Sequence, residues 1–136
     1  MSYQIQNLTS SLEDYIEEIY LGTKDNKTLK SAELARKLSV SRASVSEAIN
    51  KLVKKELVNY SSYGSITLTE KGLIKAKNVY NRHSIIKNFL QLSLNIEEKE
   101  ASETACKMEH IVTENILERM ESFNLKNTNL KTLEEL

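Results

Sequence analysis

The sequence has no proline, three glycines and a single cysteine among its 136 residues. Proline and glycine are the main interrupters of helices, so their scarcity predicts a mainly helical chain. The lone cysteine excludes an intramolecular disulfide. No apolar run approaches the roughly 18 residues that a membrane span needs. The N-terminus also lacks the basic-then-apolar layout of a secretion signal, so we expect a cytoplasmic protein with no membrane partner.

Charge is distributed unevenly along the chain although it cancels in total. The chain has 19 Lys and Arg against 19 Asp and Glu. Residues 30–82 hold 11 basic and 4 acidic residues, a net of +7, and the remainder carries 8 against 15, a net of −7. A basic middle segment suits a polyanion such as DNA, whereas acidic flanks suit cations or a solvated surface.

The first half of the sequence predicts helices followed by a β-hairpin. Apolar residues recur at helical spacing in three segments, and two β-prone runs then flank a turn that contains Gly64. The predicted helices are 8–23, 31–38 and a third that Ser41 caps, and the β-prone runs are 57–60 and 65–69. This order of elements predicts a winged helix-turn-helix.

The second half predicts a helical unit. One long helix is expected over residues 70 to about 92, and the helical pattern resumes from about 97 through 120 with a break near Val112 or Thr113. The last dozen residues are polar and predict a tail with at most one weak helical turn. With 40% hydrophobic residues, the chain has enough apolar surface for one core or for two small lobes that share the long helix.

The third predicted helix has an apolar face and a face of small and polar side chains, as a helix that reads DNA requires. Arg42 and Lys51 are candidates for phosphate contacts, and Tyr63 of the hairpin for the neighbouring DNA backbone. The candidates for base-edge or sugar contacts are Ala43, Ser44, Ser46, Glu47 and Asn50. For each residue taken singly, helix capping or solvation is as good an explanation as DNA contact. Glu47 would repel a phosphate group unless it accepts a hydrogen bond from a cytosine amino group. The order of elements and the basic segment favour DNA binding.

Cys106, Glu109 and His110 have the spacing i, i+3 and i+4, which predicts one helical face. Thiolate, carboxylate and imidazole together suit Fe(II), Zn(II), Co(II) or Ni(II) better than Mg(II) or Ca(II). Taken by itself, a lone cysteine is more often a buried core residue, and a Glu-His pair is more often an ordinary surface pair, than a metal site. Both histidines, His83 included, and the only cysteine fall beside acids downstream of the DNA-binding segment. This joint placement indicates a metal sensor.

Several segments together resemble the diphtheria toxin repressor and manganese-transport regulator family of metal-dependent repressors, and they span nearly the whole chain. The resemblance is carried by Ser-Leu-Glu-Asp-Tyr-Ile-Glu-Glu-Ile-Tyr at 11–20, Val-Ser-Glu at 45–47, Ile-Thr-Leu-Thr-Glu-Lys-Gly at 66–72, Arg-His at 82–83 and Ala-Cys-Lys-Met-Glu-His at 105–110. The resemblance implies a mainly α dimer, with a winged helix-turn-helix DNA-binding domain at 1–72. A helical dimerisation and metal-binding domain at 73–136 follows, and the long helix links the two.

The resemblance also implies site residues. The metal ligands would be Asp14 and Glu17 of the first helix, His83 of the long helix, and Cys106, Glu109 and His110. The residues that approach DNA at the start of the recognition helix would be Ser41, Ala43, Ser44 and Glu47. Because metal ligands must lose their protons, we expect affinity for metal, and hence for DNA, to fall as the pH drops through the histidine range.

Three departures from the family pattern stand out. Manganese-type members have a carboxylate at the position of Cys106, and iron-type members usually have methionine at that of Asp14, so this chain is a hybrid. The ancillary site of iron-type members needs a carboxylate at Lys87 and a histidine at Ser102, so that site is expected to be lost. The tail after Phe123 is too short for the SH3-like domain of longer members.

We therefore predict a repressor that is loaded with Fe(II) or Mn(II), binds operator DNA as a homodimer and controls metal-uptake genes. Iron is preferred because thiolate binds Fe(II) more readily than Mn(II). Whether one or two ions bind per subunit stays open. The alternative is a metal-independent winged-helix regulator that senses oxidants through Cys106. An enzyme with a small-molecule substrate is not expected, because no His-Glu-x-x-His pair or glycine-rich phosphate loop is found.

Overall fold

Helix α1 (Ser10–Thr23) opens the first of two compact units, Met1–Asn78. The computed structural model describes residues 8–135, with side chains through residue 128. Thr9 caps α1, because its side-chain oxygen accepts a hydrogen bond of 3.2 Å from the Leu12 amide. Ile16 and Ile19 of α1 are fully buried, as the helical spacing of its apolar residues predicts. A short 3₁₀ turn, η2 (Lys24–Asn26), follows α1 and was not predicted.

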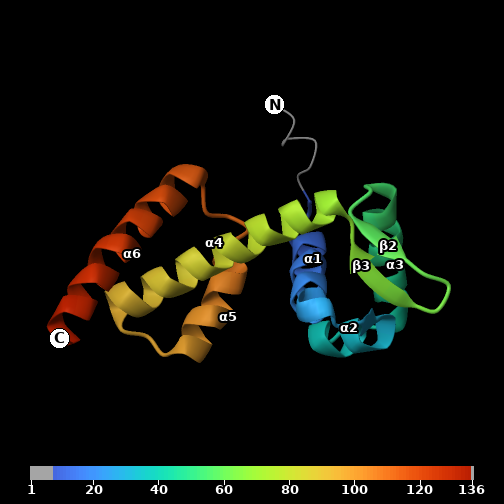
Figure 1. Ribbon diagram of the computed structural model, residues 1–136, viewed down its shortest axis with the longest axis horizontal. Helices are drawn as coiled ribbons and strands as arrows, with labels where there is room; N and C mark the ends of the chain where they lie inside the picture. Colours follow the sequence, from blue (N-terminus) through green and yellow to red (C-terminus); the bar gives the residue numbers. More distant parts are fainter. Residues whose placement is uncertain (1–7, 136) are drawn as a thin grey trace. The chain divides into compact units, whose positions relative to one another are not determined.

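Helices α2 (Ser31–Leu38) and α3 (Arg42–Lys54) form the helix-turn-helix (Figure 1). Helix α2 ends at Leu38, and its capping residue Ser39 has a φ of 55°, in the left-handed region, so the chain turns sharply there. Ser41 caps α3 as predicted, with its Oγ accepting a hydrogen bond of 3.1 Å from the Ser44 amide. The inward face of α3 consists of the buried residues Val45, Ala48, Ile49 and Leu52, as predicted.

The wing is a three-stranded antiparallel sheet of β1 (Leu29–Lys30), β2 (Val58–Tyr60) and β3 (Ser65–Leu68), in the order β1-β3-β2. The predicted hairpin is β2 and β3, in which Asn59 pairs with Thr67. The expectation of only two strands was wrong, because the two residues of β1 pair with β3 and place Leu29 opposite Ile66. A strand of two residues is too short for an alternating pattern to reveal it.

The second unit, Val79–Leu136, contains the latter part of α4 (Glu70–Leu94), α5 (Glu98–Met108) and α6 (Glu114–Glu135). Its core includes Ile86, Leu90, Ala101 and Ala105, and it is closed by α6 residues such as Leu117 (Figure 1). The Asn124 side-chain amide also donates a hydrogen bond of 2.9 Å to the carbonyl of Ile85. Helix α6 is therefore fixed to α4 by both apolar and polar contacts.

Two sequence predictions about this unit were wrong. Helix α5 ends at Met108, earlier than predicted, so Glu109 is the residue that caps it and His110 lies in the turn that follows. The last dozen residues, expected to form a tail with one weak turn, continue α6 to Glu135. The break predicted near Val112 or Thr113 does lie between α5 and α6. None of the helices within residues 8–135 is long and apolar enough to cross a bilayer.

Gly72 lies where α4 approaches the backbone of Leu57. A Cβ atom built on Gly72 would lie 1.8 Å from the Leu57 carbonyl oxygen, well inside contact distance. The Gly72 amide donates to the Thr69 hydroxyl at 2.9 Å, and that hydroxyl donates to the Glu56 carbonyl at 2.7 Å. Only glycine allows this close approach between α4 and the backbone of Leu57, which directly precedes β2.

We expect Gly72→Ala to lower the free energy of unfolding by about 2–3 kcal/mol, because the added methyl group forces backbone to move. Urea denaturation followed by circular dichroism measures the change. Lys77→Ala, at an exposed position of the same helix, is the matched control and should change stability by less than about 0.5 kcal/mol. Equal stabilities of the two variants would contradict the close approach.

Candidate functional site

The outward face of α3 is exposed at every position that the sequence assigned to DNA contact. These exposed residues are Ser41, Arg42, Ala43, Ser44, Ser46, Glu47, Asn50 and Lys51. The opposite face of the helix is anchored in the core, so the exposed face is held by a rigid base. Small and polar side chains on such a face are those that can approach base edges.

Glu47 is paired within its own helix. Its Oε1 lies 3.5 Å from the Lys51 ammonium, and both side chains are more than half exposed. Burial, and then the negative charge of Glu47, raises the pKa of Tyr15 above its usual 10.0. The ion pair offsets the repulsion that Glu47 alone would exert on a phosphate group.

Tyr63 projects from the turn of the wing and is 84% exposed. The turn is stabilised by Ser61, whose hydroxyl accepts from the amides of Tyr63 and Ser65 at 3.3 and 3.1 Å. Gly64 supplies the positive φ of 79° that the turn requires. Lys30 donates to the Tyr63 carbonyl at 3.1 Å, so the wing tip is also tied to β1.

A cluster of titratable side chains lies within the second unit, buried at His83 and Glu109 and exposed at Cys106. His83 of α4 is buried, and its Nδ1 lies 3.0 Å from Oε2 of Glu109, a carboxylate that is 1% exposed. The Sγ of Cys106, on α5, lies 3.7 Å from the same nitrogen of His83. Imidazole, carboxylate and thiol thus meet although α4 and the α5 segment are far apart in the sequence.

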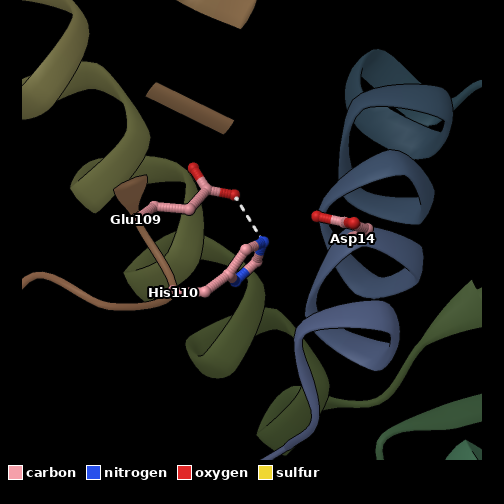
Figure 2. Close-up of side chains that lie close together, drawn as sticks. All are labelled: Asp14, Glu109 and His110. Carbon is pink, nitrogen blue, oxygen red and sulfur yellow. Dashed lines mark ion pairs between the residues drawn. The ribbon is translucent and has the colours of Figure 1, made fainter. Parts of the chain in front are cut away.

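The second oxygen of the Glu109 carboxylate lacks a hydrogen-bond partner among the residues that the structure describes, although it is buried. His110 lies beside it, with Nε2 at 3.7 Å from Oε1 (Figure 2). A buried carboxylate oxygen without a partner is costly, and a cation would relieve that cost. Two ligands bound to one ion at about 2.0–2.3 Å lie about 3–4 Å apart, which matches these distances. The residues present therefore fit a transition-metal ion.

Asp14 and Glu17 lie in the first unit, on α1, where the spacing i, i+3 places them one helical turn apart; Figure 2 labels Asp14 on this helix. Their neighbour Glu18 has a pKa raised mainly by burial; Lys37 opposes this shift and the negative charge of Asp14 adds to it. The acidic side of α1 is thus a concentrated source of carboxylate oxygens.

Arg82, next to His83 on α4, fastens the turn that carries Glu109 and His110. Its guanidinium donates to the main-chain carbonyls of Glu109 and Val112, the latter at 3.0 Å. It also lies 3.9 Å from the exposed carboxylate of Glu114. Sequence reasoning missed this role, and the only available signal was the adjacency of Arg82 to a candidate ligand.

The two positions at which the sequence departs from the ancillary-site pattern have other partners. Lys87 of α4 pairs with Glu98 of α5 at 3.5 Å. Ser102 of α5 has its Oγ 3.2 Å from Nε2 of His83. Sequence reasoning assigned Ser102 no role, because its contact with His83 joins helices 19 residues apart and leaves no local pattern.

Comparison with known proteins gives two family matches. Residues 7–66 match "Iron dependent repressor, N-terminal DNA binding domain". Residues 69–128 match "Iron dependent repressor, metal binding and dimerisation domain". The first match contains the helix-turn-helix and most of the wing, and the second contains the cluster around Glu109.

Two relatives are similar over most of their length. An uncharacterized HTH-type transcriptional regulator of Methanocaldococcus jannaschii is 44% identical over 117 residues, which cover 85% of this chain and 94% of the relative. The HTH-type transcriptional regulator MntR of Bacillus subtilis is 30% identical over 112 residues, which cover 82% of this chain and 78% of the relative.

Solved structures give the same result for the fold. The manganese regulator SloR is 34% identical, with a TM-score of 0.74 over 85% of this chain and 54% of SloR. The IdeR structure from T. acidophilum is 28% identical, with a TM-score of 0.73 over 84% of this chain and 53% of IdeR. The chain thus spans about half the length of these solved proteins.

Arg82→Met removes the donors to the turn while keeping the length of the side chain. We expect the free energy of unfolding to fall by about 2–3 kcal/mol, because two buried carbonyl groups lose a charged donor. Guanidinium denaturation measures the loss, and Arg119→Met, at an exposed position of α6, is the matched control. A loss no larger than that of the control would show that Arg82 does not fasten the turn.

Proposed function

The chain belongs to the iron-dependent repressor family of metal-dependent transcriptional regulators, and on this premise we propose that it is a repressor activated by Fe(II) or Mn(II). The observation that carries the proposal is the buried Glu109 carboxylate, one oxygen of which has no hydrogen bond among the described residues, beside two imidazoles and a thiol. The family and the relatives are regulators without enzymatic activity, as the sequence predicted. Nothing in the comparisons supports the oxidant-sensing alternative.

The proposed ligands in the second unit are His83, Cys106, Glu109 and His110. Their donor atoms are separated by 3.0–3.7 Å from their neighbours in the cluster. Following the family resemblance, we extend the ligand set to Asp14 and Glu17 of α1, whose carboxylates are hard donors one turn apart. A bound ion would supply the positive charge that the buried Glu109 carboxylate lacks.

The proposed order of preference among metals follows from donor softness. A thiolate favours Fe(II) over Mn(II), whereas carboxylates alone favour neither strongly. SloR is described as a manganese regulator, and ScaR, 31% identical, has a solved structure with Zn²⁺. Iron remains the first choice for this chain because Cys106 adds sulfur to the ligand set.

The proposed partners are operator DNA and a second copy of the chain in the cytoplasm. On the DNA side the exposed face of α3 enters the major groove, and Arg42 and Lys51 bind phosphates. The residues assigned to DNA contact are Ser41, Arg42, Ala43, Ser44, Ser46, Glu47, Asn50, Lys51 and Tyr63. On the dimer side, the second unit exposes large apolar side chains, among them Ile111 at 79%, that a partner copy would cover.

DNA binding is expected to depend on added metal. The operator is selected from a random duplex library with the full chain under anaerobic conditions, in Fe(II), in Mn(II) and in excess chelator. We expect enrichment of a two-fold symmetric sequence only with metal, with half-sites about 10 base pairs apart. His83→Ala should lose the enrichment. The control variant Lys99→Ala, which changes an exposed residue of α5, should keep it. Equal enrichment in chelator and in metal would contradict the proposal.

The metal preference is expected to change in Cys106→Glu. Replacing the soft thiolate by a hard carboxylate should lower the Fe(II)-to-Mn(II) affinity ratio by about tenfold. Competition titrations with a fluorescent chelator measure both affinities. Lys107→Glu adds a carboxylate at the next, exposed position and is the matched control, which should leave the ratio unchanged. If both variants behave alike, Cys106 is not a ligand.

A further inference from the structure

Both ring nitrogens of His83 have partners inside the second unit. Nδ1 faces the Glu109 carboxylate at 3.0 Å and the Cys106 sulfur at 3.7 Å. On the other side of the ring, Nε2 lies 3.2 Å from the hydroxyl oxygen of Ser102. The ring is buried, so its orientation is determined by these contacts rather than by solvent.

We propose that Ser102 is a positioning residue that holds the His83 ring with Nδ1 toward the carboxylate and the thiol. The proposal rests on the proposed function, since it concerns how this chain presents one ligand. The contact of Ser102 is with Nε2, on the side of the ring away from the carboxylate and the thiol, so it acts through His83.

A hydroxyl suits this position because it both donates and accepts hydrogen bonds. While Nδ1 donates its proton to the Glu109 carboxylate, Nε2 of the neutral ring is an acceptor and the Ser102 O–H donates to it. When Nδ1 is needed as a ligand, the proton must sit on Nε2, and the Ser102 oxygen then accepts from it. One side chain therefore stabilises the ring in both tautomers without moving.

The α4 and α5 backbones hold the hydroxyl at this place. Ser102 lies one turn before Cys106 on α5, so the residue that orients the imidazole and the residue that provides the thiol share one helix. One turn further along, Lys87 of α4 pairs with Glu98 of α5 at 3.5 Å. These two cross-helix contacts align the helices in the same register. Partners of this kind typically change metal affinity by about 10–100-fold when removed.

The first test examines the whole 136-residue chain without metal. The chain has two histidines, so long-range ¹H–¹⁵N spectra at pH 8 resolve the His83 ring. We expect Ser102→Ala to move the Nε2 resonance toward that of an acceptor without a hydrogen bond, and Ser102→Thr to restore it. Ser93→Ala removes a hydroxyl that donates to the Phe89 carbonyl of α4 and should leave the ring unchanged. An unchanged Nε2 resonance in Ser102→Ala would overturn the proposal.

The second test measures Co(II) affinity by anaerobic competition titration, with thermal unfolding of each variant recorded in parallel. We expect about tenfold or greater weakening in Ser102→Ala, recovery to within about threefold in Ser102→Thr, and wild-type affinity in Ser93→Ala.

Wild-type affinity in a folded Ser102→Ala overturns the positioning role. If Ser102→Ala does not fold, Ser102→Val takes its place, because it has nearly the shape of Ser102→Thr but lacks the hydroxyl. Weaker Co(II) binding by folded Ser102→Val than by Ser102→Thr, together with a displaced Nε2 resonance, supports the positioning role, and equal affinities and resonances overturn it. If the wild type binds no Co(II), Fe(II) or Mn(II), the proposed function fails, while the spectra still decide whether Ser102 orients the ring.

Discussion

The buried carboxylate of Glu109 is the constraint around which the second unit is arranged. Removing a carboxylate from water is expensive unless hydrogen bonds and opposite charge compensate it. One oxygen has His83, whereas the other has no hydrogen-bond partner among the described residues. The nearby Arg82 does not supply the missing bond, because its guanidinium binds main-chain carbonyls. His110 Nε2 lies 3.7 Å from this second oxygen. A cation bound there would compensate the buried charge, which is the physical basis of the proposed metal site.

The first unit meets a different requirement, which is to hold one helical face out of the core. Four buried side chains on α3 fix its inward side, and Ser41 fixes where the helix begins. The Glu47–Lys51 pair neutralises the one carboxylate on the outward face. The wing is braced separately through Lys30 and the Ser61 hydroxyl. These contacts all lie within the first unit, so the outward face of α3 and the wing are held by residues of that unit.

Periodicity and capping predicted most of the fold, because α1, α2, α3 and α4 each have a clear apolar face or a clear first residue. The end of α5 was beyond such reasoning: the spacing of Cys106, Glu109 and His110 also fits a continued helix. The helix ends at Met108, where Arg82, 27 residues earlier, binds the Glu109 carbonyl. Long-range contacts also explain the other differences. Strand β1 exists only through its pairing with β3, and Asn124 and the apolar residues of α6 hold the segment whose end looked like a polar tail. The domain boundary after Gly72 and the assigned site residues stay predictions.

The candidate ligand residues could be proposed from the sequence because cysteine and histidine are rare in this chain and lie beside acids. What holds them in place was not visible, because it depends on residues that have no distinctive chemistry alone. Arg82 fastens the turn and Ser102 contacts the far nitrogen of His83, so neither touches the ligand-facing atoms. A substitution that preserved all six candidate ligands but changed these two supports would keep the sequence signature of the site. It would nevertheless lose the arrangement in which the Glu109 carboxylate, the two imidazoles and the thiol lie 3.0–3.7 Å from their neighbours in the cluster.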